Sequence, residues 1–141
     1  MVPPSTHRLS QFWILTVRPG SSGRTGVPDT TPAARPFLKT RFSERYAVFS
    51  PDGRWIAYES NESGRFEIYV RAYPEGIRKW AVSTDGGMLP EWSPTGHDIY
   101  FRSLGGKMMA ARIEGTADLK VDPPRELFDA SGFENQYGVA P

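Results

Sequence analysis

Short stretches of alternating apolar and polar residues recur along this chain, and turn-forming residues separate them. A strand over residues 54–60 places Ile56 and Tyr58 on one of its faces, because alternate side chains of a strand point to opposite sides. Ile99 and Phe101 occupy the same two slots in a later stretch of the same pattern. Since both slots are apolar in both stretches, we expect this face to be the better buried one.

The two stretches belong to an internal repeat. The segment FSPDGRWIAYES begins at Phe49, and the matching segment WSPTGHDIYFRS begins at Trp92, 43 positions later. Further strand-like segments match in the same order, EIYVR with KMMAA and then RKWAVST with PRELFDA. Four short strands in a period of about 43 residues is the spacing of a β-propeller blade.

This repeat predicts an all-β fold of antiparallel four-stranded β-propeller blades that together form an incomplete propeller. The pattern reaches both ends of the chain, because FWILTV resembles the third strand of an earlier blade and QYGVAP resembles the opening RYAVFSP. The predicted units are a partial first blade with a strand at 12–17 and a flexible polar loop within 1–34, a repeat region at 35–141, complete blades at about 46–88 and 89–135, and the start of a further blade at 136–141.

Two matching turns are expected between the first and second strands of the complete blades. Proline presets φ at the second position of a type I turn, Asp tolerates the third position, and Gly takes a positive φ at the fourth. The residues of these structural turns are Ser50, Pro51, Asp52 and Gly53 in the first blade, and Ser93, Pro94 and Gly96 in the second.

The core between adjacent blades is expected where apolar residues hold equivalent slots in both copies. The second strands provide two such slots in each copy, and the third strands provide further ones. The predicted inter-blade core residues are Ile56, Tyr58, Ile68, Val70, Ile99, Phe101 and Met108. The pairs Ile56/Ile99 and Tyr58/Phe101 are expected to carry the face-to-face stacking of the two blades.

At these residues the sequence resembles the propeller repeats of TolB-like proteins, which are distant relatives of WD-type repeats. The S-P-D-G turn, the WIAY strand after it and the EIYV strand carry the resemblance, which covers roughly residues 35–141. It implies a TolB-like propeller fold and is not specific for any one function. The stretch SSGRTGVPDTTPAA at 21–34 departs from the pattern because it is longer and more polar, and we expect a flexible surface loop there.

A narrower resemblance is to propeller regions that lie C-terminal to bacterial serine/threonine kinase domains. Runs similar to AVFSPDGRWIAYESNESGRFEIYVRAYP are common in those regions. This resemblance implies a bacterial sensory or kinase-linked protein whose propeller part is this chain. The chain has no Gly-rich phosphate loop, H-R-D segment or D-F-G segment, so any kinase activity is expected to reside in other sequence.

Composition argues against several kinds of partner and binding site. Seventeen basic and 16 acidic residues give a net charge of +1, so no nucleic-acid partner is expected. The absence of cysteine excludes disulfides and thiolate metal sites. The apolar run at 12–17 is too short for a signal-peptide core or a membrane span, so no membrane contact is expected from this chain. These features assign no compartment, and the cytoplasm is the default.

Candidate catalytic and ligand-binding residues are few. His97 is expected to be a solvated turn residue, and neither it nor His7 has the Ser and Asp partners of a triad. Asp85 is followed by Gly86 and Gly87, which suits a turn better than a calcium site, because calcium needs several oxygen ligands. We therefore expect no catalytic, cofactor-binding or metal-binding residues in this chain.

Three functions remain open. The favoured one is a non-catalytic scaffold that binds a protein or small ligand at the propeller face. The second is an accessory propeller of a prolyl-oligopeptidase-like peptidase, although no G-x-S-x-G segment is present here. The third is a truncated fragment without independent function. A basic cluster that could accept acidic partners comprises Arg65, Arg71, Arg78 and Lys79.

The predicted architecture has a consequence for the isolated chain. Two blades leave apolar faces and unpaired strand edges at both ends, and further blades would have to come in cis or by oligomerisation. We expect the purified chain to be marginally stable, aggregation-prone or oligomeric in size-exclusion chromatography and thermal melting. A stable, soluble monomer would contradict this expectation.

Overall fold

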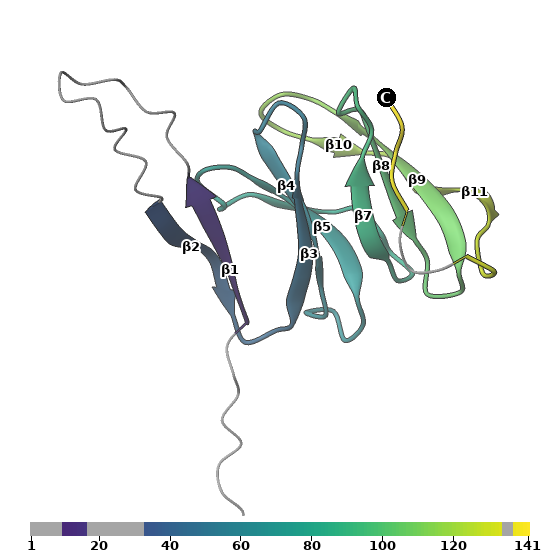
Figure 1. The fold of residues 1–141 in the computed structure, drawn as a ribbon, viewed down its shortest axis with the longest axis horizontal. Coiled ribbons are helices and arrows are strands. Elements are labelled where there is room, and N and C mark those ends of the chain that lie inside the picture. The colour runs from purple at the N-terminus through teal and green to yellow at the C-terminus, as the bar shows by residue number, and fades with distance from the viewer. Residues whose placement is uncertain (1–9, 17–32, 134–136) are drawn as a thin grey trace, which may run out of the picture.

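The described part of the chain consists of β-strands and the turns between them (Figure 1). The structure is a computed structural model, and it describes residues 10–16, 33–133 and 137–141. Its strands are β1 Ser10–Thr16, β2 Ala33–Thr40, β3 Glu44–Phe49, β4 Trp55–Ser60, β5 Glu67–Ala72, β6 Lys79–Ala81, β7 Met88–Trp92, β8 Asp98–Arg102, β9 Lys107–Glu114, β10 Lys120–Val121 and β11 Arg125–Asp129.

Two antiparallel sheets follow one another along the chain, and each is a meander. The first sheet has the strand order β3-β4-β5-β6. In the second sheet β7, β8 and β9 follow in order, and both β10 and β11 pair with the outer edge of β9. Because β11 pairs with the start of β9 and β10 with its end, these two strands share the outermost position. Each sheet is a propeller blade, and the chain forms an incomplete β-propeller.

A two-stranded sheet of β1 and β2 packs against the first blade (Figure 1). The rings of Phe12 and Tyr58 meet edge to face with 5.9 Å between their centroids, and Leu38 is buried beside Tyr58. The predicted strand at 12–17 overlaps β1. The last two residues of the predicted loop, 33–34, belong to β2, and the rest of that loop lies outside the described residues.

The largest core cluster lies between the two complete blades. Ile99 and Phe101 of β8 pack there with apolar side chains of β4 and β5. Ala57, Ile68 and Val70 are among those partners, and none of the three exposes any measurable surface. Burial of this apolar area on both sides of the joint is what holds one blade against the next.

Contrary to the sequence-based expectation, Ile56 and Tyr58 do not meet Ile99 and Phe101. Successive blades have the same orientation, so equivalent side chains point the same way. Each of the two pairs therefore contacts the sheet that comes before its own blade in the chain. Tyr58 therefore packs on β1 and β2, and Ile56 lines a small hollow with Phe12. The two complete blades meet face to back, with the opposite face of β4 turned toward β8.

The burial of β4 and the position of Met108 also differ from the expected pattern. Both faces of β4 are buried, since every residue from Trp55 to Ser60 is at most 7% exposed. Met108 is buried, but it lies on the face of β9 opposite to the inter-blade cluster, since it pairs across the sheet with Arg102. Alternation along β9 places Met109 and Ala111 in the cluster in its place.

The two Ser-Pro turns have the same hydrogen-bond pattern. Gly53 and Gly96 have φ values of +70° and +73°, which glycine adopts without a Cβ penalty. Each glycine amide donates to the serine carbonyl three residues earlier, over 2.9 Å in both turns. The hydroxyls of Ser50 and Ser93 then accept from the amides of Trp55 and Asp98, so these buried serines close the start of the following strand.

Polar contacts join the two blades at the end where these turns lie. Arg54 donates to the carbonyl oxygen of Thr116 over 2.5 Å, and Arg78 donates to that of Ala117 over 2.7 Å. Arg78 also lies 3.5 Å from the carboxylate of Asp118. Because both arginines belong to the first blade and the loop belongs to the second, these contacts fix the outer rims of the blades relative to each other.

Candidate functional site

The first strands of the two blades, β3 and β7, lie close together and border a cavity of about 360 Å³. Residues 46–48 of β3, residues 89–91 of β7 and Tyr137 line this cavity, which we term the inner-strand pocket. In a propeller the blades surround a central channel, and the close approach of β7 to β3 places the pocket at that inner edge.

Equivalent positions of successive repeats form the inner-strand pocket. Tyr46 and Leu89 are 43 positions apart, and their φ values are 53° and 56°. A positive φ is uncommon for residues of these types, and here each coincides with a register shift in the pairing of β3 with β4 or of β7 with β8. Such bulges redirect side chains, and backbone outliers of this kind cluster at binding sites.

A third repeat contributes Tyr137 to the pocket. Tyr137 matches Tyr46 in the repeat alignment, and its hydroxyl donates a hydrogen bond to the carbonyl oxygen of Leu89. The amide of Leu89 donates to Oε1 of Glu59 over 2.5 Å. Side chains from two neighbouring repeats therefore hold both backbone polar groups of Leu89, which explains how its left-handed conformation is maintained.

Two carboxylates determine the charge around the pocket. Glu59 is fully buried, and its Oε2 lies 2.7 Å from Nε of Arg45, so its charge is balanced. Glu91 forms no hydrogen bond or ion pair with the described residues, and burial raises the pKa of its carboxyl. Burial, followed by the negative charges of Glu91 and Glu59, raises the pKa of Tyr137. Glu91 is therefore the one carboxyl group of the described pocket lining, and no cation among the described residues pairs with it.

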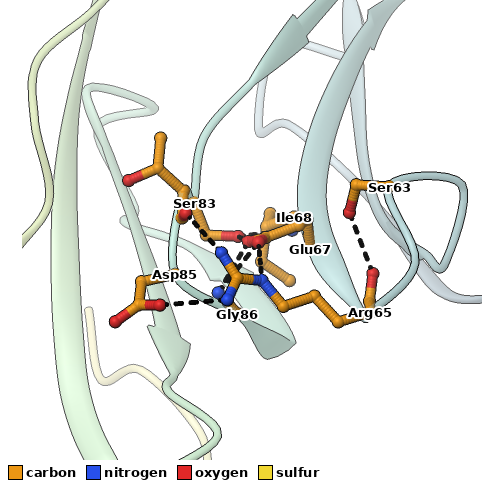
Figure 2. Close-up of polar contacts among 8 residues, drawn as sticks. Ser63, Arg65, Glu67, Ile68, Ser83, Asp85 and Gly86 are labelled. Atoms are coloured by element: carbon orange, nitrogen blue, oxygen red, sulfur yellow. Dashed lines mark hydrogen bonds and ion pairs between the residues drawn. The ribbon is translucent and has the colours of Figure 1, made fainter.

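A separate polar network secures the crossover from the first blade to the second (Figure 2). Glu67 is 4% exposed, and it accepts hydrogen bonds from the Ser83 hydroxyl and from the Gly86 amide, the latter over 2.9 Å. Arg65 lies between Glu67 and Asp85, with nitrogen–oxygen distances of 2.8 Å and 3.1 Å. The carboxylate is fully used by these partners, so the network is structural.

The network also shows what the Asp-Gly-Gly segment does. Asp85 pairs with Arg65, and Gly86 has a φ of +86° where its amide points at Glu67. A Cβ on Gly87 would lie 2.8 Å from side-chain atoms of both Ile68 and Ser83. Backbone conformation and close packing therefore account for both glycines, and the segment forms a turn into the second blade.

The four basic residues of the predicted cluster do not share one surface. Arg65 pairs with Glu67, and Lys79 pairs with Glu62. Arg71 donates to the Tyr58 hydroxyl over 2.8 Å, whereas Arg78 belongs to the contacts at the turn end. Arg71 and Lys79 are cross-strand partners on β5 and β6, but each of the four cations already has an acceptor within the chain.

The other residues singled out by sequence lie away from the pocket. The turns at 50–53 and 93–96 are at the ends of β3 and β7, whereas Tyr46 and Leu89 lie near the beginnings of those strands. His97 is exposed beside the second turn, and its carbonyl accepts from Ile113. His7 lies outside the described residues.

Sequence reasoning did not identify the pocket residues Tyr46, Glu91 and Tyr137, nor the buried Glu59. One signal was available, because Glu91 occupies the slot held by Val48 in the first copy. A carboxylate in a slot that is apolar in the other copy indicates a position under a different requirement from packing.

Two kinds of feature are absent from the described residues, a metal-binding cluster and a membrane-spanning helix. These residues contain no group of three or more His, Cys, Asp or Glu side chains placed to hold a metal ion. They also contain no helix that is long and apolar enough to cross a membrane.

The chain is similar to known proteins over part of its length. No protein-family model matches this sequence. Over 56 residues it is 36% identical to an uncharacterized protein of Agrobacterium fabrum, which is 39% of this chain and 19% of that protein. Among solved structures, TolB from Acinetobacter baumannii is similar with a TM-score of 0.49 and 21% identity, over 67% of this chain and 24% of the TolB chain. The chain thus spans about a quarter or less of each of these proteins.

Replacement of Glu67 by alanine tests the crossover network. The change leaves the buried Gly86 amide and Ser83 hydroxyl without their acceptor, so we expect Glu67→Ala to lower the free energy of unfolding by about 2–4 kcal/mol. Urea denaturation measures this loss. The exposed pair of Glu126 with Lys107 provides the control, and Glu126→Ala should cost less than about 1 kcal/mol. Equal losses in the two variants would contradict the assigned role of Glu67.

Proposed function

We propose that this chain is a non-catalytic β-propeller segment that acts as a binding scaffold, and that the inner-strand pocket is where a protein segment or small ligand is held. The observation that carries the proposal is the convergence of three repeats on one cavity, two of them through residues with left-handed backbone. Bulges are over-represented next to functional sites, so their repetition at Tyr46 and Leu89 supports a role in binding.

The side chains of the pocket support the same proposal. Tyr46 is 56% exposed, although tyrosine is a large and largely apolar side chain. Glu91 is partly desolvated without a partner among the described residues, which disfavours the folded state. Exposed aromatic rings and desolvated charges are retained at binding sites because a ligand makes use of them.

The scaffold function assigns no catalytic role to the described residues. His97 is exposed at a turn, and the buried carboxylates of Glu59 and Glu67 are engaged in hydrogen bonds with their neighbours. Any kinase or peptidase chemistry of a larger parent protein is therefore attributed to sequence outside this chain.

Removal of the Tyr46 ring tests the assignment of the pocket. Peptides selected by random-peptide display on the unmodified chain should bind Tyr46→Asn at least about tenfold more weakly, because an aromatic anchor contributes strongly to binding. Asparagine tolerates the left-handed backbone, so the fold should be retained. Dissociation constants from calorimetric titration give the comparison.

The matched control removes an exposed apolar side chain elsewhere. Ile77 is 82% exposed in the turn after β5, at the other end of the blades, so Ile77→Asn should leave peptide affinity unchanged. Equal affinity of the selected peptides for the Tyr46→Asn chain and the unmodified chain would count against binding at the pocket.

We further propose that the propeller is the sensory part of a kinase-linked protein. The support is the likeness of AVFSPDGRWIAYESNESGRFEIYVRAYP to propeller runs found after bacterial kinase domains. The coding sequence upstream of the Met1 codon tests this, since an in-frame H-R-D and D-F-G pair is expected there. An in-frame G-x-S-x-G segment downstream of Pro141 would instead support the accessory propeller of a peptidase.

A further inference from the structure

We infer that the inner-strand pocket binds an organic cation, a guanidinium or ammonium group of the kind carried by an arginine or lysine side chain. This inference rests on the proposed binding function of the pocket. It follows from the charge balance around the cavity, from the aromatic rings that border it, and from its volume.

The charge around the pocket favours a cation. Two carboxylates lie near the pocket, and Arg45 together with the Leu89 amide already satisfies Glu59. Glu91 lines the cavity and has no partner among the described residues. An anion entering the cavity would be repelled by Glu91, and a neutral apolar group would leave that carboxylate unpaired and further desolvated, which is costly. A cation relieves this cost.

The aromatic rings at the pocket also favour a cation. A cation within about 6 Å of a tyrosine ring is attracted by the ring's negative face. The Arg45 guanidinium already lies 5.8 Å from the centroid of the Tyr46 ring. The same guanidinium lies 3.8 Å from the centroid of the Phe66 ring, so aromatic rings already hold one cation beside the pocket. Tyr137 also lines the cavity, and its hydroxyl donates to the Leu89 carbonyl.

The size and donor set of the pocket narrow the class of cation. A cavity of about 360 Å³ lies at the small end of ligand sites, so it suits one side chain or a small amine. A calcium ion takes about six to eight oxygen ligands, whereas Glu91 is the single unpaired carboxylate among the described lining residues. A planar or compact organic cation satisfies one carboxylate and adjacent rings.

A matched pair of probes tests the inference. Nα-acetyl-arginine amide and Nα-acetyl-citrulline amide have nearly the same shape, and only the first is charged. We expect calorimetric titration of the full chain to show saturable binding of the arginine probe and at least about tenfold weaker binding of the citrulline probe. Methylguanidinium is a third arm, because its binding without binding of the arginine probe would indicate a small free guanidinium compound instead of a protein side chain.

Variants of the chain localise the effect. Glu91→Gln should reduce affinity for the arginine probe at least about tenfold, because it removes the charge and keeps the shape. The control is Glu75→Gln, which removes an exposed carboxylate in the turn after β5. Equal affinity for arginine and citrulline probes, or no effect of Glu91→Gln, would overturn the cation inference.

The outcomes separate this inference from the proposed function. Binding of the citrulline probe that depends on Tyr46, without any preference for charge, would end the cation inference and leave the pocket as a binding site. Absence of binding by all three probes, together with display-selected peptides that ignore Tyr46→Asn, would end both proposals. Circular dichroism of each variant shows whether the fold is retained.

Discussion

The stacking of one sheet on the next is the interaction on which the rest of the structure depends. A four-stranded blade has two apolar faces, and the largest cluster forms only because the second blade covers the back of the first. β4 shows the consequence, since it is buried on both sides, by β1 and β2 on one face and by the second blade on the other. Each blade therefore requires a neighbour in both directions.

The polar groups at the joint follow from this stacking. Once the apolar faces are in contact, the rims of the blades are close enough for side chains of one repeat to reach the backbone of another. Arg54 binds a loop of the second blade at the turn end, and Glu67 holds the crossover at the opposite end. Burial of apolar surface is non-directional, and these hydrogen bonds fix the orientation of one blade relative to the other.

The inner edge of the joint differs from the outer edge in chemistry. There the strands depart from regular pairing, and Tyr46 and Leu89 adopt left-handed backbone. Side chains of neighbouring repeats hold Leu89 through its amide and its carbonyl. The same arrangement leaves Glu91 lining a cavity, so irregular pairing, buried charge and open volume occur together at one place. This coincidence is the physical basis for assigning function to the pocket.

The sequence by itself determined the repeat, the strand segments and the Ser-Pro turns, because alternation and turn chemistry act between residues close in the chain. The pairing of Ile99 with the back of β4 rather than with Ile56 was decided only by tertiary structure, since alternation defines two faces but not which neighbour covers each. The pocket was likewise beyond sequence. Tyr46, Glu91 and Tyr137 are far apart in the chain, and only the packing of successive repeats around one inner edge places them on the same cavity.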